Sequence, residues 1–530
     1  MFIRQNVYDL GDDWAEPILW FARGVQAMNT RKLDDITSWQ FYAAIHGYSR
    51  WLWNFHGITQ PGDPEPADDQ NNPTYINQCQ HQSWYFLPWH RGYLLALERQ
   101  IRHEIEQLGG PHDTWALPYW NYLEAGRGQI PPAFRTPDWP DGVGNNPLFI
   151  EQRWGPMAVD PTYDPNLHVN VNSLLDRAFT GPGNGGSTGF GGPLTGFNWS
   201  QGENGGVESQ PHNVVHGQVG GRNLAQFLPL PPPRDQIPVP GLMSVPSTAA
   251  FDPIFWLHHC NIDRLWESWN VFPANKISIN PNDWNNPAGA NWQDGPAFSG
   301  DRPFALPNPD RTQWTFTPGE MADIAALEYS YADLTPGAVV QPDVLTARVA
   351  LLGLAQPAAL SGGVAMAGDK VVEKLGSGDT AVTLSGQAGK RSGVALDGAT
   401  MARLATSLSG GAPGLPDRVF LNLENVRSRS DAVLFQVYVG LPSGAVPADN
   451  PDHLAGTVSL FGASVASDPN DLHAGEGTTH VIEITGIVDR LHLSDSLDGP
   501  EIGVDLVPVD EIPAAAGVEI GNISIYRQSE

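Results

Sequence analysis

Residues 252–266 read DPIFWLHHCNIDRLW, and residues 81–98 read HQSWYFLPWHRGYLLALE. Apolar residues recur three and four positions apart from Ile254 to Trp266 and from Trp89 to Glu98, which predicts two helices with a buried apolar face. The stretch 181–192 is rich in Gly and the stretch 229–240 is rich in Pro, so both are predicted to be loops over the surface. This part of the chain is therefore predicted to be mainly α, with long loops.

The composition changes towards the C-terminus. All 18 Trp lie at or before Trp314, and a helical pattern ends near Tyr331, ahead of the breaker Pro336-Gly337. Beyond it, apolar and polar residues alternate in short runs that predict strands, at 419–423, 433–439, 458–461, 481–484 and 523–526. We therefore predict a mainly α domain over 1–336, an Ala- and Gly-rich linker over 337–370, and a C-terminal β-sandwich over 371–530.

Composition and charge exclude several classes of protein. With 530 residues, 41% of them hydrophobic and 16% charged, the chain can bury large cores and is not disordered. The 29 basic residues against 58 acidic ones argue against nucleic acid as a partner. The start, MFIRQNVYDL, lacks the features of a signal peptide, and no apolar run could span a membrane, which predicts a cytoplasmic protein unless a carrier exports it. Homo-oligomerisation stays open.

Histidines supply the chemical signal. Eleven of the 15 lie in the first 260 residues, and His212 and His216, four apart, would present both imidazoles on one helix face. A second set is His81 and His90, for which His46 or His56 upstream could be the third member. A later helix carries the pair His258-His259. Two groups of three imidazoles favour a metal that accepts all-nitrogen ligands: zinc, copper, iron or nickel. The segment His212 to His216 lacks the glutamate of the zinc hydrolase motif H-E-x-x-H, which weakens that interpretation.

The two stretches quoted first resemble the two copper signatures of the tyrosinase and polyphenol oxidase family. Together with Ile45-His46-Gly47 and residues 211–216, the resemblance reaches from about Arg4 to Tyr331. It implies a four-helix bundle that holds two copper ions, followed here by a C-terminal β-domain. It implies His46, His81 and His90 as ligands of the first copper, and His212, His216 and His259 as ligands of the second. His258 is then a packing residue beside the site, and His56 is the competitor of His46.

The same resemblance suggests roles for residues beside the ligands. Cys79, in Cys79-Gln80-His81, matches a spacing at which many members link the sulfur to the ligand's imidazole carbon, and the alternative is a buried free thiol. Glu208 matches a carboxylate that holds a water near the coppers, Asn213 would orient that water, and Glu203 is the rival base.

The remaining roles concern the entrance and the scaffold. Pro246 stands thirteen residues before His259, where plant catechol oxidases place a bulky Phe, and Gly217 adds no bulk, so a wide entrance is predicted. Arg4 with Tyr329 and Tyr331 resembles a structural pairing of the family, held by stacking of guanidinium on an aromatic ring. Cys260 is expected to be a small buried residue.

The resemblance implies an enzyme that uses dioxygen and small phenolic substrates. Its reactions would be ortho-hydroxylation of monophenols and oxidation of o-diphenols to o-quinones, as in a tyrosinase. The alternatives are a catechol or o-aminophenol oxidase without monophenolase activity and, more remotely, an oxygen carrier like the haemocyanins. The C-terminal part resembles the domain that covers the copper site in latent polyphenol oxidases, so we expect a lid, with simple stabilisation of the fold as the other interpretation.

Overall fold

The structure is a computed structural model of the chain. It describes residues 1–69, 72–176, 178–197, 202–271, 291–337, 371–378, 380–408, 417–470, 474–494 and 501–529. The predicted linker lies outside these residues, apart from residue 337. Among the described helices, none combines the length and the apolar character that a membrane span requires.

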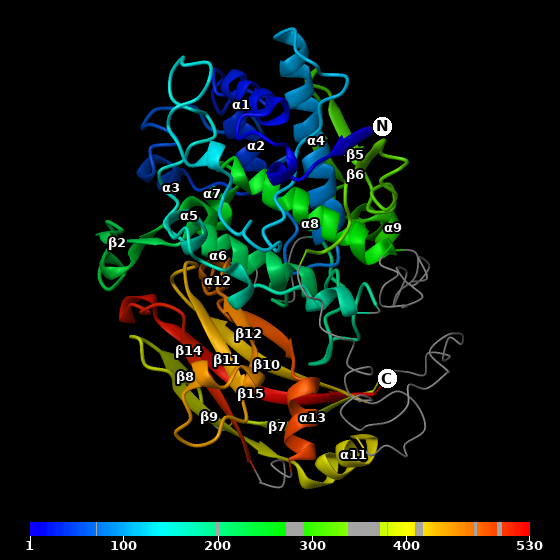
Figure 1. The fold of residues 1–530 in the computed structure, drawn as a ribbon, viewed down its shortest axis with the longest axis vertical. Helices are drawn as coiled ribbons and strands as arrows, with labels where there is room; N and C mark the ends of the chain where they lie inside the picture. The colour runs from blue at the N-terminus through cyan, green and yellow to red at the C-terminus, as the bar shows by residue number, and fades with distance from the viewer. Residues whose placement is uncertain are drawn as a thin grey trace.

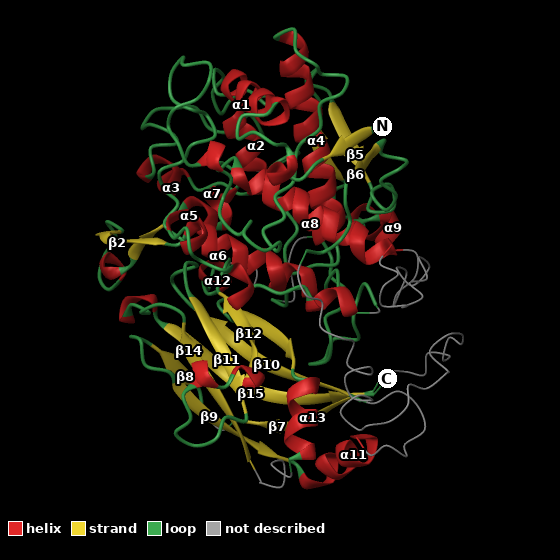
Figure 2. Cartoon of the chain, viewed as in Figure 1, coloured by secondary structure: helices red, strands yellow, loops and turns green. Residues whose placement is uncertain are grey.

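Helices dominate the first part of the chain, which forms the upper domain in Figures 1 and 2. The two helices predicted from the quoted stretches are α4 (Phe86–Gln107) and α8 (Ile254–Val271), which pack against each other. The others are α1 (Glu16–Met28), α2 (Trp39–His46), α3 (Arg50–Phe55), α5 (Pro156–Val159), α6 (Val214–Gly220), α7 (Pro246–Ala249) and α9 (Asn291–Asp294). The predicted mainly α domain is confirmed, and we call it the helical domain.

The apolar pattern of α4 explains its central place. Every residue from Phe86 to Glu98 is buried, which is the behaviour of a helix that is apolar on most of its surface. The shorter α2 is capped by Ser38, the residue before it, whose side chain accepts a hydrogen bond from the Phe41 N–H. It ends at His46, because Gly47 is extended. The last residue of α2 is thus held at the inner end of a buried helix.

Three two-stranded sheets accompany the helices among the described residues of the helical domain. They are β1 (Phe2–Arg4) with β6 (Tyr329–Tyr331), β2 (Arg222–Phe227) with β3 (Pro238–Pro240), and β4 (Phe304–Pro307) with β5 (Gln313–Phe316). The first pair is parallel and places Arg4 opposite Tyr331. The start of the domain is therefore tied to its end.

The C-terminal part folds as a second domain, below the first in Figure 1. Its strands are β7 (Val372–Ser377), β8 (Val382–Leu384), β9 (Lys390–Leu396), β10 (Arg418–Arg427), β11 (Leu434–Val439), β12 (Leu454–Ser459), β13 (Thr478–Glu483), β14 (Glu501–Pro508) and β15 (Val518–Gln528). Helices α11 (Gly398–Leu408), α12 (Ala463–Ala466) and α13 (Thr485–Leu493) accompany them. A β-domain after a helical domain is the predicted order.

The sheet differs from the predicted sandwich in one respect. Its strands form one antiparallel sheet of nine strands in the order β12-β11-β14-β9-β7-β15-β10-β13, with β8 beside β15, instead of two stacked sheets. The end strands β12 and β13 also touch, so the sheet is nearly closed into a barrel. Most of the strands contribute buried apolar side chains to one core, and alternating runs such as 419–423 satisfy this geometry as well as that of a sandwich.

The Gly-rich loop corrects a second expectation. Residues 185–193 are buried, although the loop was predicted to run over the surface. A Cβ on Gly185 would lie 2.7 Å from the ring of Tyr526 in β15, and one on Gly189 would lie 2.5 Å from the Phe179 carbonyl oxygen. Glycine is required at these two positions because φ is positive at both and neighbouring atoms occupy the place of a Cβ. The Pro-rich stretch is exposed from 231 to 236, as expected.

Candidate metal centre

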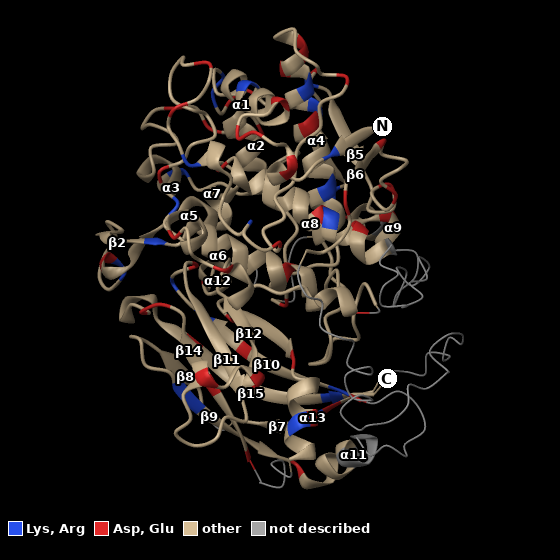
Figure 3. Ribbon diagram, in the orientation of Figure 1, with Lys and Arg blue, Asp and Glu red and all other residues tan. Residues whose placement is uncertain are grey.

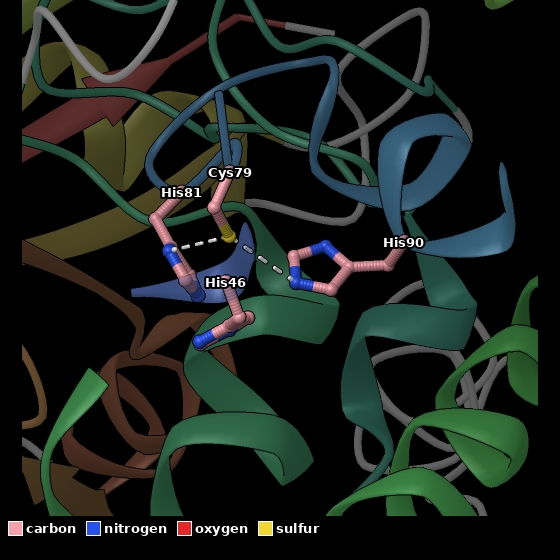
Figure 4. A group of neighbouring side chains, drawn as sticks. All are labelled: His46, Cys79, His81 and His90. Carbon is pink, nitrogen blue, oxygen red and sulfur yellow. Dashed lines mark hydrogen bonds between the residues drawn. The ribbon is translucent and has the colours of Figure 1, made fainter. Parts of the chain in front are cut away.

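The first group of histidines comes from two helices and a loop. His46 ends α2, His90 lies in the first turns of α4, and His81 lies in the loop before α4. Their ring centroids are 5.2 to 5.7 Å apart. Figure 4 shows the three rings around the sulfur of Cys79. One ligand atom from each of these four residues lies within 4.8 Å of the others.

The second group lies where three segments meet. His212 lies in a wide helical turn (η5, Glu208–Asn213), His216 lies in the following α6, and His259 lies in α8. The Nε2 atom of His212 is 3.2 Å from Nε2 of His259 and 3.1 Å from Nε2 of His216. Such separations match nitrogen ligands about 2 Å from one shared metal ion. The spacing of four residues therefore brings His212 and His216 together, as predicted.

The two groups face each other across an apolar interior. The rings of His90 and His259 stack with centroids 4.5 Å apart, and His81 lies 5.9 Å from His212. The ring centroid of Phe255 lies 4.1 Å from that of His259 and 4.8 Å from that of His46, so one aromatic ring contacts both groups. Two metal ions held here would be close neighbours with little water around them.

Most of the rings are oriented by a hydrogen bond at Nδ1. His46 Nδ1 lies 2.9 Å from the Pro246 carbonyl oxygen, His90 Nδ1 lies 2.8 Å from that of Phe86, and His216 Nδ1 lies 2.7 Å from that of Met243. His212 Nδ1 lies 2.8 Å from Oδ1 of Asn213. This leaves Nε2 as the nitrogen for a metal, and the Nε2 atoms of His46 and His81 are buried without a partner. The residues therefore fit two metal ions.

The charge of the site follows from burial. Burial lowers the pKa of His46 to about 4. Burial, together with repulsion between neighbouring histidines, holds the pKa well below the ordinary value in the other five predicted ligands, His81, His90, His212, His216 and His259. Neutral imidazole is the form that binds metal. Among the described residues, neither group includes a carboxylate. All-nitrogen ligation suits copper better than calcium, magnesium or manganese.

Cys79 lies between two of the predicted ligands. Its Sγ is 3.5 Å from Nδ1 of His81 and 3.7 Å from Nε2 of His90 (Figure 4). The sulfur is thus next to the imidazole that the predicted thioether would join. Cys260 is buried elsewhere, with Sγ 3.6 Å from the Leu117 carbonyl oxygen, as expected of a small packed residue.

Of the two candidate bases, the structure brings Glu208 to the site. Its side chain is 1% exposed, and both of its oxygens lie 2.9 Å from the backbone N–H of Gln82, the residue after His81. Burial raises the pKa of Glu208 to about 8 against the hydrogen bonds from Gln82 and Gly205, which lower it. Glu203 instead faces the C-terminal domain, where burial and Glu424 raise its pKa.

The other predicted site residues have clear positions. Gly217 and Pro246 both face the C-terminal domain: a Cβ on Gly217 would lie 2.8 Å from Leu434, and Pro246 lies 3.7 Å from the Cβ position of Gly462. His258 is fully buried and its ring stacks on that of His212, with centroids 5.3 Å apart. One of its ring nitrogens lies within 4.8 Å of the ligand atoms of the second group, so distance alone does not separate His258 from the predicted ligands. His56 belongs to neither group.

Phe461 is a site residue that the sequence did not reveal. It follows β12 in the turn before α12, and its ring stacks on His216 with centroids 4.2 Å apart. The same ring lies 5.8 Å from His212 and 6.0 Å from His81, so it contacts both groups. The predicted strand 458–461 includes Phe461, but the strand ends at Ser459. No local pattern distinguishes this Phe from a core residue of the sheet.

A buried ionic network supports the two long helices from behind. The Arg4 guanidinium lies 3.9 Å from the ring centre of Tyr329, as predicted, and its Nη1 donates to Tyr331 Oη at 2.8 Å. It also pairs with Glu98 at 2.7 Å and Asp263 at 3.1 Å, partners that the sequence did not indicate. Figure 3 shows charges of both signs on α4 and α8, where this network lies. The network therefore joins β1, α4 and α8. Its member in α8 is Asp263, four residues after the predicted ligand His259.

Comparisons with known proteins agree with this geometry. The common central domain of tyrosinase matches residues 36–183 and 161–271, and a domain of unknown function matches residues 371–528. The chain is 30% identical over 542 residues to a tyrosinase of Hahella sp. (strain CCB-MM4), with 100% of both chains covered. It is 25% identical to a chloroplastic polyphenol oxidase of Malus domestica over 95% of this chain and 74% of that one.

Two solved structures share the fold. Latent apple tyrosinase superposes with a TM-score of 0.54 at 20% identity, over 100% of this chain and 97% of that one. A latent aurone synthase superposes with a TM-score of 0.55 at 18% identity, over 99% of this chain and 89% of that one.

Proposed function

Because the chain belongs to the tyrosinase family and holds two copper ions, we propose that it uses dioxygen to hydroxylate monophenols and to oxidise o-diphenols to o-quinones. The observation that carries the proposal is the pair of facing imidazole groups, with His90 and His259 stacked 4.5 Å apart. The ligands would be His46, His81 and His90 for one copper and His212, His216 and His259 for the other. When bound there, two copper ions would supply one electron each, which matches the two-electron reduction of dioxygen.

The chain's own residues would handle the proton and the substrate. A phenol must lose its hydroxyl proton before its oxygen can bind a metal, and Glu208 is the buried carboxylate beside the first group that can take it. Asn213 accepts the hydrogen bond that fixes the His212 ring, so its amide supports a predicted ligand. Substrate would enter past Pro246 and Gly217, which add little bulk.

Oxygen uptake tests this function. The copper-loaded full-length chain is given p-cresol or 4-methylcatechol, a monophenol and its matching diphenol, and initial rates are compared. We expect uptake with both substrates. Uptake with 4-methylcatechol alone would make the protein a catechol oxidase and would contradict the proposed role of Glu208. The substitution His259→Asn is the control, because it should remove uptake with both substrates together with one copper.

We further propose that the C-terminal domain is a lid over the copper site. The support is the ring of Phe461, which is 6% exposed and lies on His216 where a phenol ring would have to lie. Leu434 from β11 adds a second apolar contact, against Gly217. Both side chains belong to the hydrophobic core of the helical domain instead of that of their own sheet.

Shortening Phe461 tests the lid without removing the domain. Phe461→Ala in the full-length chain should raise diphenol oxidation at least several-fold, because it vacates the place of the ring. Phe435→Ala is the matched control, since Phe435 lies in the core of the sheet and away from the coppers. Diphenol rates of Phe461→Ala that equal those of the unaltered chain, at equal copper content, would show that the domain does not shield the site.

A further inference from the structure

The turn that carries His212 is tied to the C-terminal domain through one side chain. Gln210 lies two residues before His212, and its backbone (φ −142°, ψ 122°) breaks the helical path inside η5. Its Nε2 donates to the backbone oxygen of Thr457 in β12 at 2.9 Å and to that of His168 at 3.2 Å. Its Oε1 accepts from the Asn170 N–H at 3.3 Å.

Thr457 meets the helical domain at two points. Besides its carbonyl, its hydroxyl lies 3.3 Å from Nδ1 of His168. The Thr457 side chain is 5% exposed, and Gln210 and His168 are half-buried, so these hydrogen bonds lie in a partly buried contact. Strand β12 also lies against both η5 and α6. The contact is therefore a built junction between the sheet and the segment that carries two of the predicted ligands.

Three of the other five predicted ligands have a backbone partner at Nδ1 within the helical domain, whereas Nδ1 of His259 is buried without a partner. His46, His90 and His216 are oriented by carbonyl oxygens of Pro246, Phe86 and Met243. His212 has only the neighbouring Asn213 side chain at its Nδ1. Its position therefore depends on the backbone of η5, which Gln210 anchors to β12.

We propose that the junction of Gln210, His168 and Thr457 makes the C-terminal domain a structural support of the second copper group, so that the docked domain slows the loss of copper from that group. Movement of β12 away from η5 would release the kinked turn and let the His212 ring leave its place beside His216 and His259. The domain then retains copper, whether or not it also shields the site from phenols.

Copper release from the full-length, copper-loaded chain tests this. An excess of a Cu(I) chelator, bathocuproine disulfonate, is added with a reductant and no phenol, and the coloured complex is followed over time. Gln210→Leu removes three hydrogen bonds of the junction, and we expect one of the two coppers to leave roughly three- to tenfold faster. Thr457→Val removes only the hydroxyl contact from the C-terminal side, so the same copper should leave about two- to threefold faster.

Arg222→Met is the matched control. Arg222 also joins the domains, through the carbonyl oxygens of Ala432 and Glu511, but it lies in β2, beyond the end of α6, and neither of these contacts involves the kinked turn. Its release curve should equal that of the unaltered chain. Acceleration in Gln210→Leu alone would mean that the effect is confined to the helical domain, and equal acceleration in Arg222→Met would mean that any weaker docking suffices. Each of these two results would overturn the proposal, and so would unchanged copper release in both Gln210→Leu and Thr457→Val. All of these measurements are made without phenol, so they do not depend on whether the domain acts as a lid.

Discussion

The carboxylate of Glu208 is the group whose loss should separate the two proposed reactions. Glu208→Gln replaces the ionisable group and keeps an oxygen that can accept the Gln82 N–H. A charge-assisted hydrogen bond is stronger than a neutral one by about 1 kcal/mol, so the change should cost either reaction roughly fivefold through local geometry. Loss of a general base costs about 10² to 10⁴ in rate. Only monophenol hydroxylation needs this base, so its kcat/KM should fall by a further factor of about 10² or more.

The measured quantity is the ratio of kcat/KM for p-cresol to that for 4-methylcatechol, at equal copper content. Glu203→Gln is the control: Glu203 is a half-buried carboxylate of the same segment that faces the C-terminal domain, so the ratio should not change. An unchanged ratio in Glu208→Gln would refute the base assignment, and a fall in Glu203→Gln alone would transfer it to that residue.

The same carboxylate predicts a pH dependence. Burial raises the pKa of Glu208 to about 8, so the ionised base becomes more abundant as the pH rises towards that value. Bound copper adds positive charge nearby and moves the inflection below pH 8. Monophenol hydroxylation should therefore increase with pH up to this inflection, and Glu208→Gln should remove the rising limb while diphenol oxidation keeps its profile.

Two further predictions concern the scaffold and the cross-link. Arg4→Met leaves the buried carboxylates of Glu98 and Asp263 without their shared partner, and breaking such a buried pair costs about 3 to 5 kcal/mol. The midpoint of urea unfolding of the helical domain should therefore shift to a lower urea concentration. An unchanged midpoint would contradict the stabilising role of this network. If Cys79 is joined to His81, the peptide that contains both should be lighter by two hydrogen atoms in mass spectrometry and should not react with a thiol reagent after unfolding, whereas the unaltered mass would show a free thiol.

The six predicted copper ligands came from the resemblance to the family's copper signatures, and local geometry accounts for one pair of them. Residues four apart meet on one helical face, which places His212 and His216 together even though η5 is wound more widely than an α-helix. The choice of His46 over His56 came from the neighbouring residues, and the structure supports it by burying His46 in the first group. The Nδ1 partners of His46 and His216 could not be predicted, because the carbonyl oxygens of Pro246 and Met243 belong to segments distant in sequence.

The strands could be predicted from the sequence where apolar and polar residues alternate. The near-closure of the sheet into a barrel could not be predicted. Alternation tells which face of β10 or β11 is buried, but a sandwich and a barrel bury the same faces. The difference lies in whether the end strands β12 and β13 meet, which depends on pairing between segments distant in sequence. The buried Gly-rich loop has the same origin: its glycines permit a turn at the surface and equally permit close packing under Tyr526.

The contacts that would regulate the site are the ones furthest from sequence patterns. Phe461 has the apolar neighbours of a core strand, and only the end of β12 at Ser459 turns its ring towards His216 instead of into the sheet. Gln210 and Thr457 are 247 positions apart, and neither residue type marks a functional site. Both contacts arise because the second domain packs against the segments that carry the predicted ligands. The helical domain would thus supply the copper ligands, while side chains of the β-domain would control the entry of phenols and the loss of copper.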